Sequence, residues 1–144
     1  MLKDTRILAV EDNPVNQMVI SEILLSGGIA VESVDSGIKA LELLKKNDYD
    51  AVLMDVQMPD MDGLETTKRI RRDLKMADLP IIAMTAHAMR GDRERCIEAG
   101  MDDYVSKPVE REQIFAVLHK NIKRTIVTAE VSSASPVGRM WRPE

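Results

Sequence analysis

The chain has 144 residues, of which 44% are hydrophobic and 31% are charged, and a formal net charge of −4. This length fits one domain with one buried core, and the acidic balance excludes the basic surface that is typical of nucleic-acid-binding proteins. A single cysteine, Cys96, excludes an internal disulfide and a cysteine-rich zinc site, and the absence of a signal-peptide pattern predicts a cytoplasmic protein without direct membrane contact.

Short apolar runs alternate with segments of helical spacing along most of the chain. Runs rich in Val, Ile and Leu predict five strands, at residues 7–10, 30–34, 51–54, 81–84 and 104–105. Helices are expected to follow them, at about residues 14–26, 37–47, 63–74, 89–99 and 110–123. This alternation predicts an α/β protein with a single doubly wound, five-stranded parallel sheet and helices on both faces.

Capping residues mark the ends of the expected helices. Asn13, Ser36 and Asp62 are expected to cap the first three helices, and Glu65 follows Asp62 at the spacing of a capping box. Gly27 and the glycine after it are expected to close the first helix.

The last part of the chain breaks this pattern. It contains Ser, Pro and Gly but no sustained apolar period. We therefore predict one domain at residues 1–124, followed at residues 125–144 by a flexible tail, a linker or residues left by cloning.

Polar side chains follow the strands at the places where the strands end. They are Glu11 and Asp12 after the first strand, Asp55 after the third, Thr85 after the fourth and Lys107 after the fifth. With strand order 2-1-3-4-5, the first and third strands are neighbours about 5 Å apart, so the three carboxylates converge at one edge of the sheet. Carboxylates this close repel one another unless a cation compensates them, and Mg²⁺ suits an all-oxygen site.

Together these residues describe a site for a phosphoryl group. Lys107 supplies a second positive charge, Thr85 a hydroxyl group and Asp55 a carboxylate nucleophile. Asp55 is the candidate nucleophile because it is the first polar residue after four apolar ones and therefore lies at the sheet edge. Asp60 and Asp62 have simpler interpretations, as a turn residue and a helix cap.

Four motifs in the same order resemble the receiver domains of two-component response regulators. They are "VEDN", "LMDVQMPDMDG", "MTA" and "YVSKP", and the resemblance runs from about Thr5 to Lys123. It implies a flavodoxin-like fold and a phosphoryl group accepted by Asp55 from a phosphohistidine of a partner. It also implies that Mg²⁺, or Mn²⁺ as a substitute, is held by Asp55, Asp12, the backbone carbonyl of Gln57 and, through water, Glu11.

The resemblance also implies a switch. Lys107 would contact a phosphoryl oxygen and its bond to Pro108 would be cis, while Thr85 would move toward the phosphate and Tyr104 would turn inward behind it. The face built by the fourth helix, the fifth strand and the fifth helix would then change shape, as in a two-state element biased by one phosphoryl group. Such a domain is a signalling phosphoacceptor rather than an enzyme, although it contributes catalysis to its own phosphorylation and to slow autodephosphorylation.

The segments "EDNPVNQ" and "MTAHAM" are most similar to receivers of hybrid sensor histidine kinases. This resemblance predicts a sensor histidine kinase or a histidine phosphotransfer domain as partner, and membrane attachment through the rest of such a kinase. A phosphorylation-dependent dimer through the fourth and fifth helices is left open. Gln57 and His87 occupy positions that vary within the family, and we predict that they set the dephosphorylation rate.

The first helix has more apolar residues than one stripe requires. Ile20, Ile23 and Leu24 fit one arc and are expected to face the sheet, while Val15 and Met18 point elsewhere. We hypothesise that Val15 and Met18 dock a partner helix. The alternative is that Val15 and Met18 are extra apolar residues on the surface that bind no partner.

Two other functions are open to a chain with this pattern. A degenerate receiver would serve only as an interaction module, but Asp55, Asp12 and Lys107 are all present. An aspartate-nucleophile phosphatase of the haloacid dehalogenase type needs a second Asp two residues after the nucleophile, where this chain has Gln57. Dinucleotide and nucleotide binding are disfavoured because the chain lacks GxGxxG after the first strand and lacks a GxxxxGK loop.

Overall fold

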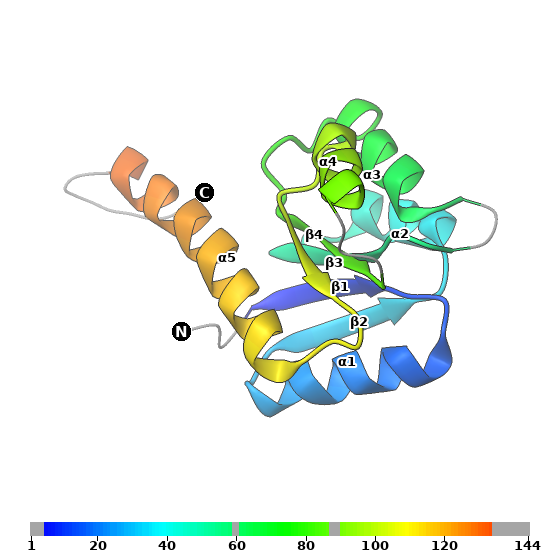
Figure 1. Cartoon of the computed structure of the whole chain (residues 1–144). Helices are drawn as coiled ribbons and strands as arrows, with labels where there is room; N and C mark the ends of the chain where they lie inside the picture. Colours follow the sequence, from blue (N-terminus) through cyan, green and yellow to red (C-terminus); the bar gives the residue numbers. More distant parts are fainter. Residues whose placement is uncertain (1–4, 59–60, 87–89, 134–144) are drawn as a thin grey trace.

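The computed structural model describes residues 5–58, 61–86 and 90–133 of the chain. Its five strands form one parallel sheet in the order β2-β1-β3-β4-β5 (Figure 1). The strands are β1 (Arg6–Val10), β2 (Ala30–Val34), β3 (Ala51–Asp55), β4 (Ile81–Thr85) and β5 (Asp103–Ser106). The predicted fold class and strand order are confirmed.

Within the described ranges, five helices alternate with these strands. They are α1 (Pro14–Ser26), α2 (Gly37–Lys46), α3 (Gly63–Arg72), α4 (Arg90–Ala99) and α5 (Arg111–Ser133). In the described part of the chain, none of these helices has the length and apolar character needed to cross a membrane.

Two apolar cores cover the two faces of the sheet because side chains alternate along each strand. On one face, Ile7 and Leu53 pack with Ile20 of α1 and Ile114 of α5. The alternate strand residues, such as Leu8 and Val52, point to the other face of the sheet, where they pack against α2, α3 and α4. All four of the strand residues Ile7, Leu8, Ala9 and Val10 are fully buried, which explains why this strand is a continuous apolar run.

The predicted caps of the first three helices are confirmed. The side chain of Asn13 accepts hydrogen bonds from the backbone N–H groups of Val15 and Asn16. Ser36 accepts from Lys39, and Asp62 accepts from Glu65. These bonds satisfy helix N–H groups that have no partner inside the helix.

The predicted end of the last helix was wrong. We placed it at Lys123, but α5 continues to Ser133 and extends away from the sheet (Figure 1). The tail composition that suggested an early end is dominated by its later residues, and the first proline after Lys123 is Pro136. Without Pro or Gly between Lys123 and Ser133, no residue forces the backbone out of the helix. The domain boundary at residue 124 stays a prediction.

Candidate functional site

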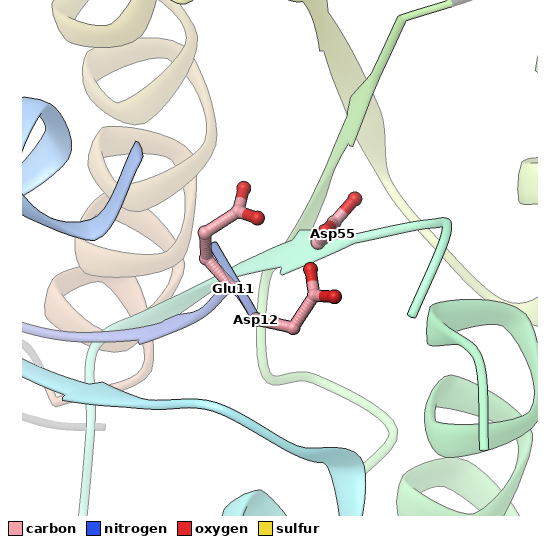
Figure 2. A group of neighbouring side chains, drawn as sticks. All are labelled: Glu11, Asp12 and Asp55. Carbon is pink, nitrogen blue, oxygen red and sulfur yellow. The ribbon is translucent and has the colours of Figure 1, made fainter. Parts of the chain in front are cut away.

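Three carboxylates meet at the carboxyl edge of the sheet. Strands β1 and β3 are paired with Val10 opposite Met54, so the next residues, Glu11 and Asp55, lie side by side at the end of the sheet. One carboxylate oxygen from each of Glu11, Asp12 and Asp55 lies within 4.8 Å of the others. Figure 2 shows Glu11 and Asp12 extending from the end of β1 toward Asp55 at the end of β3. The predicted convergence is therefore present.

Lys107 binds two of these carboxylates from the other side. Its Nζ donates a hydrogen bond to Asp55 Oδ1 at 2.9 Å. The same Nζ lies 3.0 Å from Glu11 Oε1, although the geometry is not that of a hydrogen bond. Glu11 and Asp55 are each only 1% exposed, so solvent screens these charges very little.

Among the described residues, two carboxylate oxygens in the site lack a hydrogen-bond donor. Asp55 Oδ2 and Glu11 Oε1 are buried and accept no hydrogen bond from the described residues. A buried, unsatisfied carboxylate oxygen is costly, and one ammonium group does not balance three carboxylates. The oxygen-rich donor set and the missing positive charge together fit a hard divalent cation such as Mg²⁺.

The electrostatics of the site shift two pKa values. Burial raises the pKa of Asp55 to about 7; the hydrogen bond from Lys107 opposes this shift, and contact with Glu11 adds to it. For Lys107, burial favours the neutral form, but the hydrogen bond to Asp55 and the nearby carboxylate charges outweigh it, so its pKa is raised. Near neutral pH, Asp55 is therefore close to its titration midpoint while Lys107 stays charged.

A cleft opens next to the carboxyl ends of β3 and β4. Its volume of about 510 Å³ is in the range of ligand sites, and its lining includes Val56, Gln57, Met58, Asp62, Thr85 and Arg95. The backbone N–H of Gln57 donates to Asp55 Oδ1 at 3.2 Å, which holds the loop after β3 against the carboxylate. Thr85, at the end of β4, is 5% exposed, and its carbonyl accepts a bond from the backbone N–H of Lys107.

The remaining predicted site residues lie elsewhere. Tyr104 on β5 is half-buried and contacts the guanidinium of Arg93, 5.8 Å from the ring centre, beside a small cavity between α4 and β5. The peptide bond between Lys107 and Pro108 is cis. Val15 and Met18 lie outside the carboxylate cluster on the exposed side of α1, whereas Ile20 and Leu24 of that helix are buried as predicted. His87 and Asp60 lie outside the described residues.

Sequence reasoning missed two residues that shape the site. Gly63 begins α3 against the backbone of Asp55, and a Cβ at this position would lie 2.1 Å from the Asp55 carbonyl oxygen. Gln17 of α1 donates side-chain hydrogen bonds to the carbonyls of Glu11 and Val34. Gly63 could have been found from the sequence, because it directly follows the cap residue Asp62. The partners of Gln17 could not, because they depend on the fold.

This geometry agrees with the comparison to known protein families. Residues 7–119 match the model of the response regulator receiver domain. The chain belongs to this family.

Curated relatives of the receiver domain are hybrid sensor kinases. The histidine-protein kinase BarA of Escherichia coli K12 is 40% identical over 131 residues, which are 88% of this chain and 14% of BarA. The sensor histidine kinase GacS of Pseudomonas protegens is 42% identical over 118 residues, which are 80% of this chain and 13% of GacS. The chain therefore spans less than a sixth of the length of these kinases and corresponds to their receiver regions.

Solved receiver domains have the same fold. The receiver domain of sensor histidine kinase PA1611 from Pseudomonas aeruginosa PAO1 has a TM-score of 0.77 and 45% identity, covering 83% of this chain and 98% of that one. Its structure has a magnesium ion coordinated in the active-site cleft. The chemotaxis protein CheY4 of Vibrio cholerae has a TM-score of 0.77 and 26% identity, covering 81% of this chain and 98% of that one.

Proposed function

We propose that this receiver domain accepts a phosphoryl group on Asp55 from a phosphohistidine of a partner protein. The observation that supports this proposal most strongly is the buried Asp55 carboxylate, which is held by Lys107 beside two further carboxylates. One of its oxygens accepts no hydrogen bond from the part of the chain that the structure describes. A nucleophile needs such a free oxygen, and a phosphoryl acceptor needs compensating positive charge close to it.

The transfer makes one bond and breaks one bond. An oxygen of Asp55 forms a bond to phosphorus, the bond from phosphorus to the histidine nitrogen breaks, and the imidazole leaves with the electron pair of that bond. Asp55 must be ionised to attack, and its pKa of about 7 leaves a large fraction in that form at neutral pH. Lys107 is placed to bind a phosphoryl oxygen after it releases Asp55 Oδ1.

The cation site is assigned to the residues that the fold brings together. Asp12 and Asp55 with the Gln57 carbonyl would hold Mg²⁺, and Glu11 would do so through water, with Mn²⁺ as a substitute. Bound Mg²⁺ would supply positive charge against the carboxylates and a phosphoryl oxygen. The magnesium ion in the related PA1611 receiver domain supports this assignment.

The switch and the fate of the phosphoryl group follow from the same arrangement. Thr85 would move toward the phosphoryl group, and Tyr104 would turn further into the space between α4 and β5.

Gln57 would tune slow hydrolysis together with His87, because the backbone N–H of Gln57 donates a hydrogen bond to Asp55 at the cleft wall. A phosphorylation-dependent dimer through α4 and α5 stays a prediction.

The phosphodonor would be a histidine kinase or a histidine phosphotransfer domain, as part of a hybrid kinase relay. The similarity to receiver regions of BarA and GacS supports this subtype. Phosphoryl transfer from such a donor, without the second aspartate of a hydrolase, makes the domain a signalling phosphoacceptor rather than an enzyme.

The proposal is tested with acetyl phosphate as a small phosphodonor and intact mass as the readout. We expect the wild type to gain one phosphoryl group in Mg²⁺ and none in EDTA, and Asp55→Asn to gain none in either. The matched control is Asp62→Asn, which changes a nearby carboxylate but keeps a side chain that caps α3. A wild type that binds Mg²⁺ and takes up no phosphoryl group would instead support a degenerate receiver used as an interaction module.

A second prediction concerns the docking surface on α1. Val15 and Met18 are 66% and 62% exposed near the end of α1 that begins beside the carboxylates. We expect Met18→Glu to slow phosphotransfer from phosphorylated histidine phosphotransfer domains about tenfold or more, because a charge in an apolar contact costs binding energy.

The matched control for this surface lies on the same helix. Leu25 is 61% exposed and lies seven positions after Met18, which places it about 10 Å further along α1. Leu25→Glu should leave the phosphotransfer rate within about twofold, and both variants should accept phosphate from acetyl phosphate normally. Equal phosphotransfer rates for Met18→Glu and the wild type would show that these apolar residues are not a docking surface.

A further inference from the structure

The loop between β1 and α1 contains two of the three carboxylates, and one side chain of α1 binds its backbone. The side-chain amide Nε2 of Gln17 donates to the carbonyl oxygen of Glu11 at 2.5 Å and to that of Val34 at 3.3 Å. The Val34 carbonyl also accepts a bond from the backbone N–H of Glu11 at 3.0 Å. The half-buried Gln17 therefore connects α1, the end of β2 and the loop that follows β1.

These bonds continue the sheet beyond the last paired residue of β1. Regular pairing between β1 and β2 ends at Val10 and Val34, so among the described strands the carbonyl of Glu11 has no partner. An amide nitrogen has two hydrogens, and Gln17 uses them on two carbonyls. The Glu11 carbonyl belongs to the peptide that joins Glu11 to Asp12, so this bond sets the orientation of the backbone between the two carboxylate residues.

Asp12 depends on that backbone orientation more than its neighbours do. The Glu11 carboxylate is held by the backbone N–H of Asn13 at 3.1 Å and by Lys107, and Asp55 is held by Lys107. Within the described ranges, the Asp12 side chain makes no hydrogen bond or ion pair. Its direction into the cluster therefore follows from the peptide that Gln17 holds.

We propose that Gln17 is a positioning residue for the cation site, acting through the peptide between Glu11 and Asp12. This inference rests on the proposed function, because it requires that the three carboxylates bind a cation. Side chains that orient metal ligands typically contribute 10-fold to 100-fold to metal affinity. Removing the amide of Gln17 should weaken Mg²⁺ binding by at least about tenfold.

The test compares two amide-to-methionine changes at neighbouring positions of α1. Gln17→Met keeps the length of the side chain and removes both donors, whereas Asn16→Met removes an amide that makes no side-chain hydrogen bond with the described residues. Mg²⁺ affinity is measured by isothermal titration calorimetry on the whole chain. The free energy of unfolding is measured by urea denaturation in EDTA, where a cation has no influence.

We expect the Mg²⁺ dissociation constant of Gln17→Met to rise about tenfold or more and that of Asn16→Met to stay within about twofold. Unchanged Mg²⁺ affinity in a folded Gln17→Met would overturn the inference. If Gln17→Met does not fold, the same titration is made with Gln17→Ala, which fits a helix without a new contact. Unfolding of both variants in EDTA and in excess Mg²⁺ would show a purely structural role and would also overturn it.

The wild-type titration separates this inference from the proposed function. A wild type that binds no Mg²⁺ removes the cation site itself, and both proposals then fail together. In the other outcome, the wild type binds Mg²⁺ and is phosphorylated, while Gln17→Met binds Mg²⁺ with equal affinity. That result leaves the proposed function intact and removes only the role of Gln17.

Discussion

The metal-free protein is expected to lose stability as the pH rises from about 4 to about 8, and the titration of Asp55 is the expected cause. Burial, opposed by the hydrogen bond from Lys107 and reinforced by Glu11, raises the pKa of Asp55 from 3.8 to about 7. The unfolded chain loses this proton near its ordinary pKa, whereas the folded chain keeps it to about pH 7. The folded state therefore binds more protons in this window, and its stability falls as pH rises.

The size of the effect follows from the shift. A change from 3.8 to about 7 corresponds to a loss of about 4 kcal/mol in the free energy of unfolding once the pH is above both values. Urea denaturation in EDTA at pH 5, 6, 7 and 8 measures the part of this loss that lies above pH 5, which is about 3 kcal/mol. Asp55→Asn is the control, because its amide does not titrate, and the difference between the two profiles isolates Asp55. Parallel profiles for the wild type and Asp55→Asn would contradict the prediction.

Mg²⁺ should reverse most of this loss. A cation held by Asp55 competes with the proton, so the gain in stability on adding Mg²⁺ should be small at pH 5 and grow up to pH 8. The rise in melting temperature at saturating Mg²⁺ measures it at each pH. A gain that is the same at pH 5 and pH 8 would show that Asp55 does not share its site with the cation.

The sheet and the carboxylate cluster were predictable from local patterns. Runs such as Ile7 to Val10 are short and wholly apolar, which indicates strands buried on both faces, and parallel strands end at one edge. Asp55 and Glu11 directly follow two such runs, so their convergence needed only the strand order. The caps at Asn13 and Ser36 were equally local, because each bond joins residues at most three positions apart.

The features that could not be predicted depend on contacts between distant parts of the chain. Gln17 binds the carbonyl of Val34, and a residue pattern contains no signal for that pairing. Burial and Glu11 raise the pKa of Asp55, whereas Lys107 lowers it. Only the distances in the folded protein decide which effect is larger. The prediction of where α5 ends was wrong for a different reason. It relied on the composition of the whole tail, which includes residues beyond the end of the helix at Ser133.

Replacing Lys107 is expected to slow phosphorylation of Asp55 strongly. Lys107→Met removes an ammonium group that lies 2.9 Å from Asp55 Oδ1 and 3.0 Å from Glu11 Oε1. Loss of one fixed charge that stabilises a transition state typically slows a reaction by about 100-fold to 1,000-fold. We therefore expect phosphoryl uptake from acetyl phosphate in excess Mg²⁺ to slow by at least about 100-fold, measured by intact mass over time.

The same change should destabilise the protein, and a double variant separates the two effects. Removing one partner of a buried ion pair costs about 3 kcal/mol or more, because the carboxylates left behind are unpaired. Changing Glu11 to Gln as well removes one of these charges, so the double variant should regain part of the stability lost in Lys107→Met at pH 8. It should regain none of the phosphoryl uptake, because the ammonium is still missing. Recovery of both would mean that Lys107 acts only by stabilising the fold.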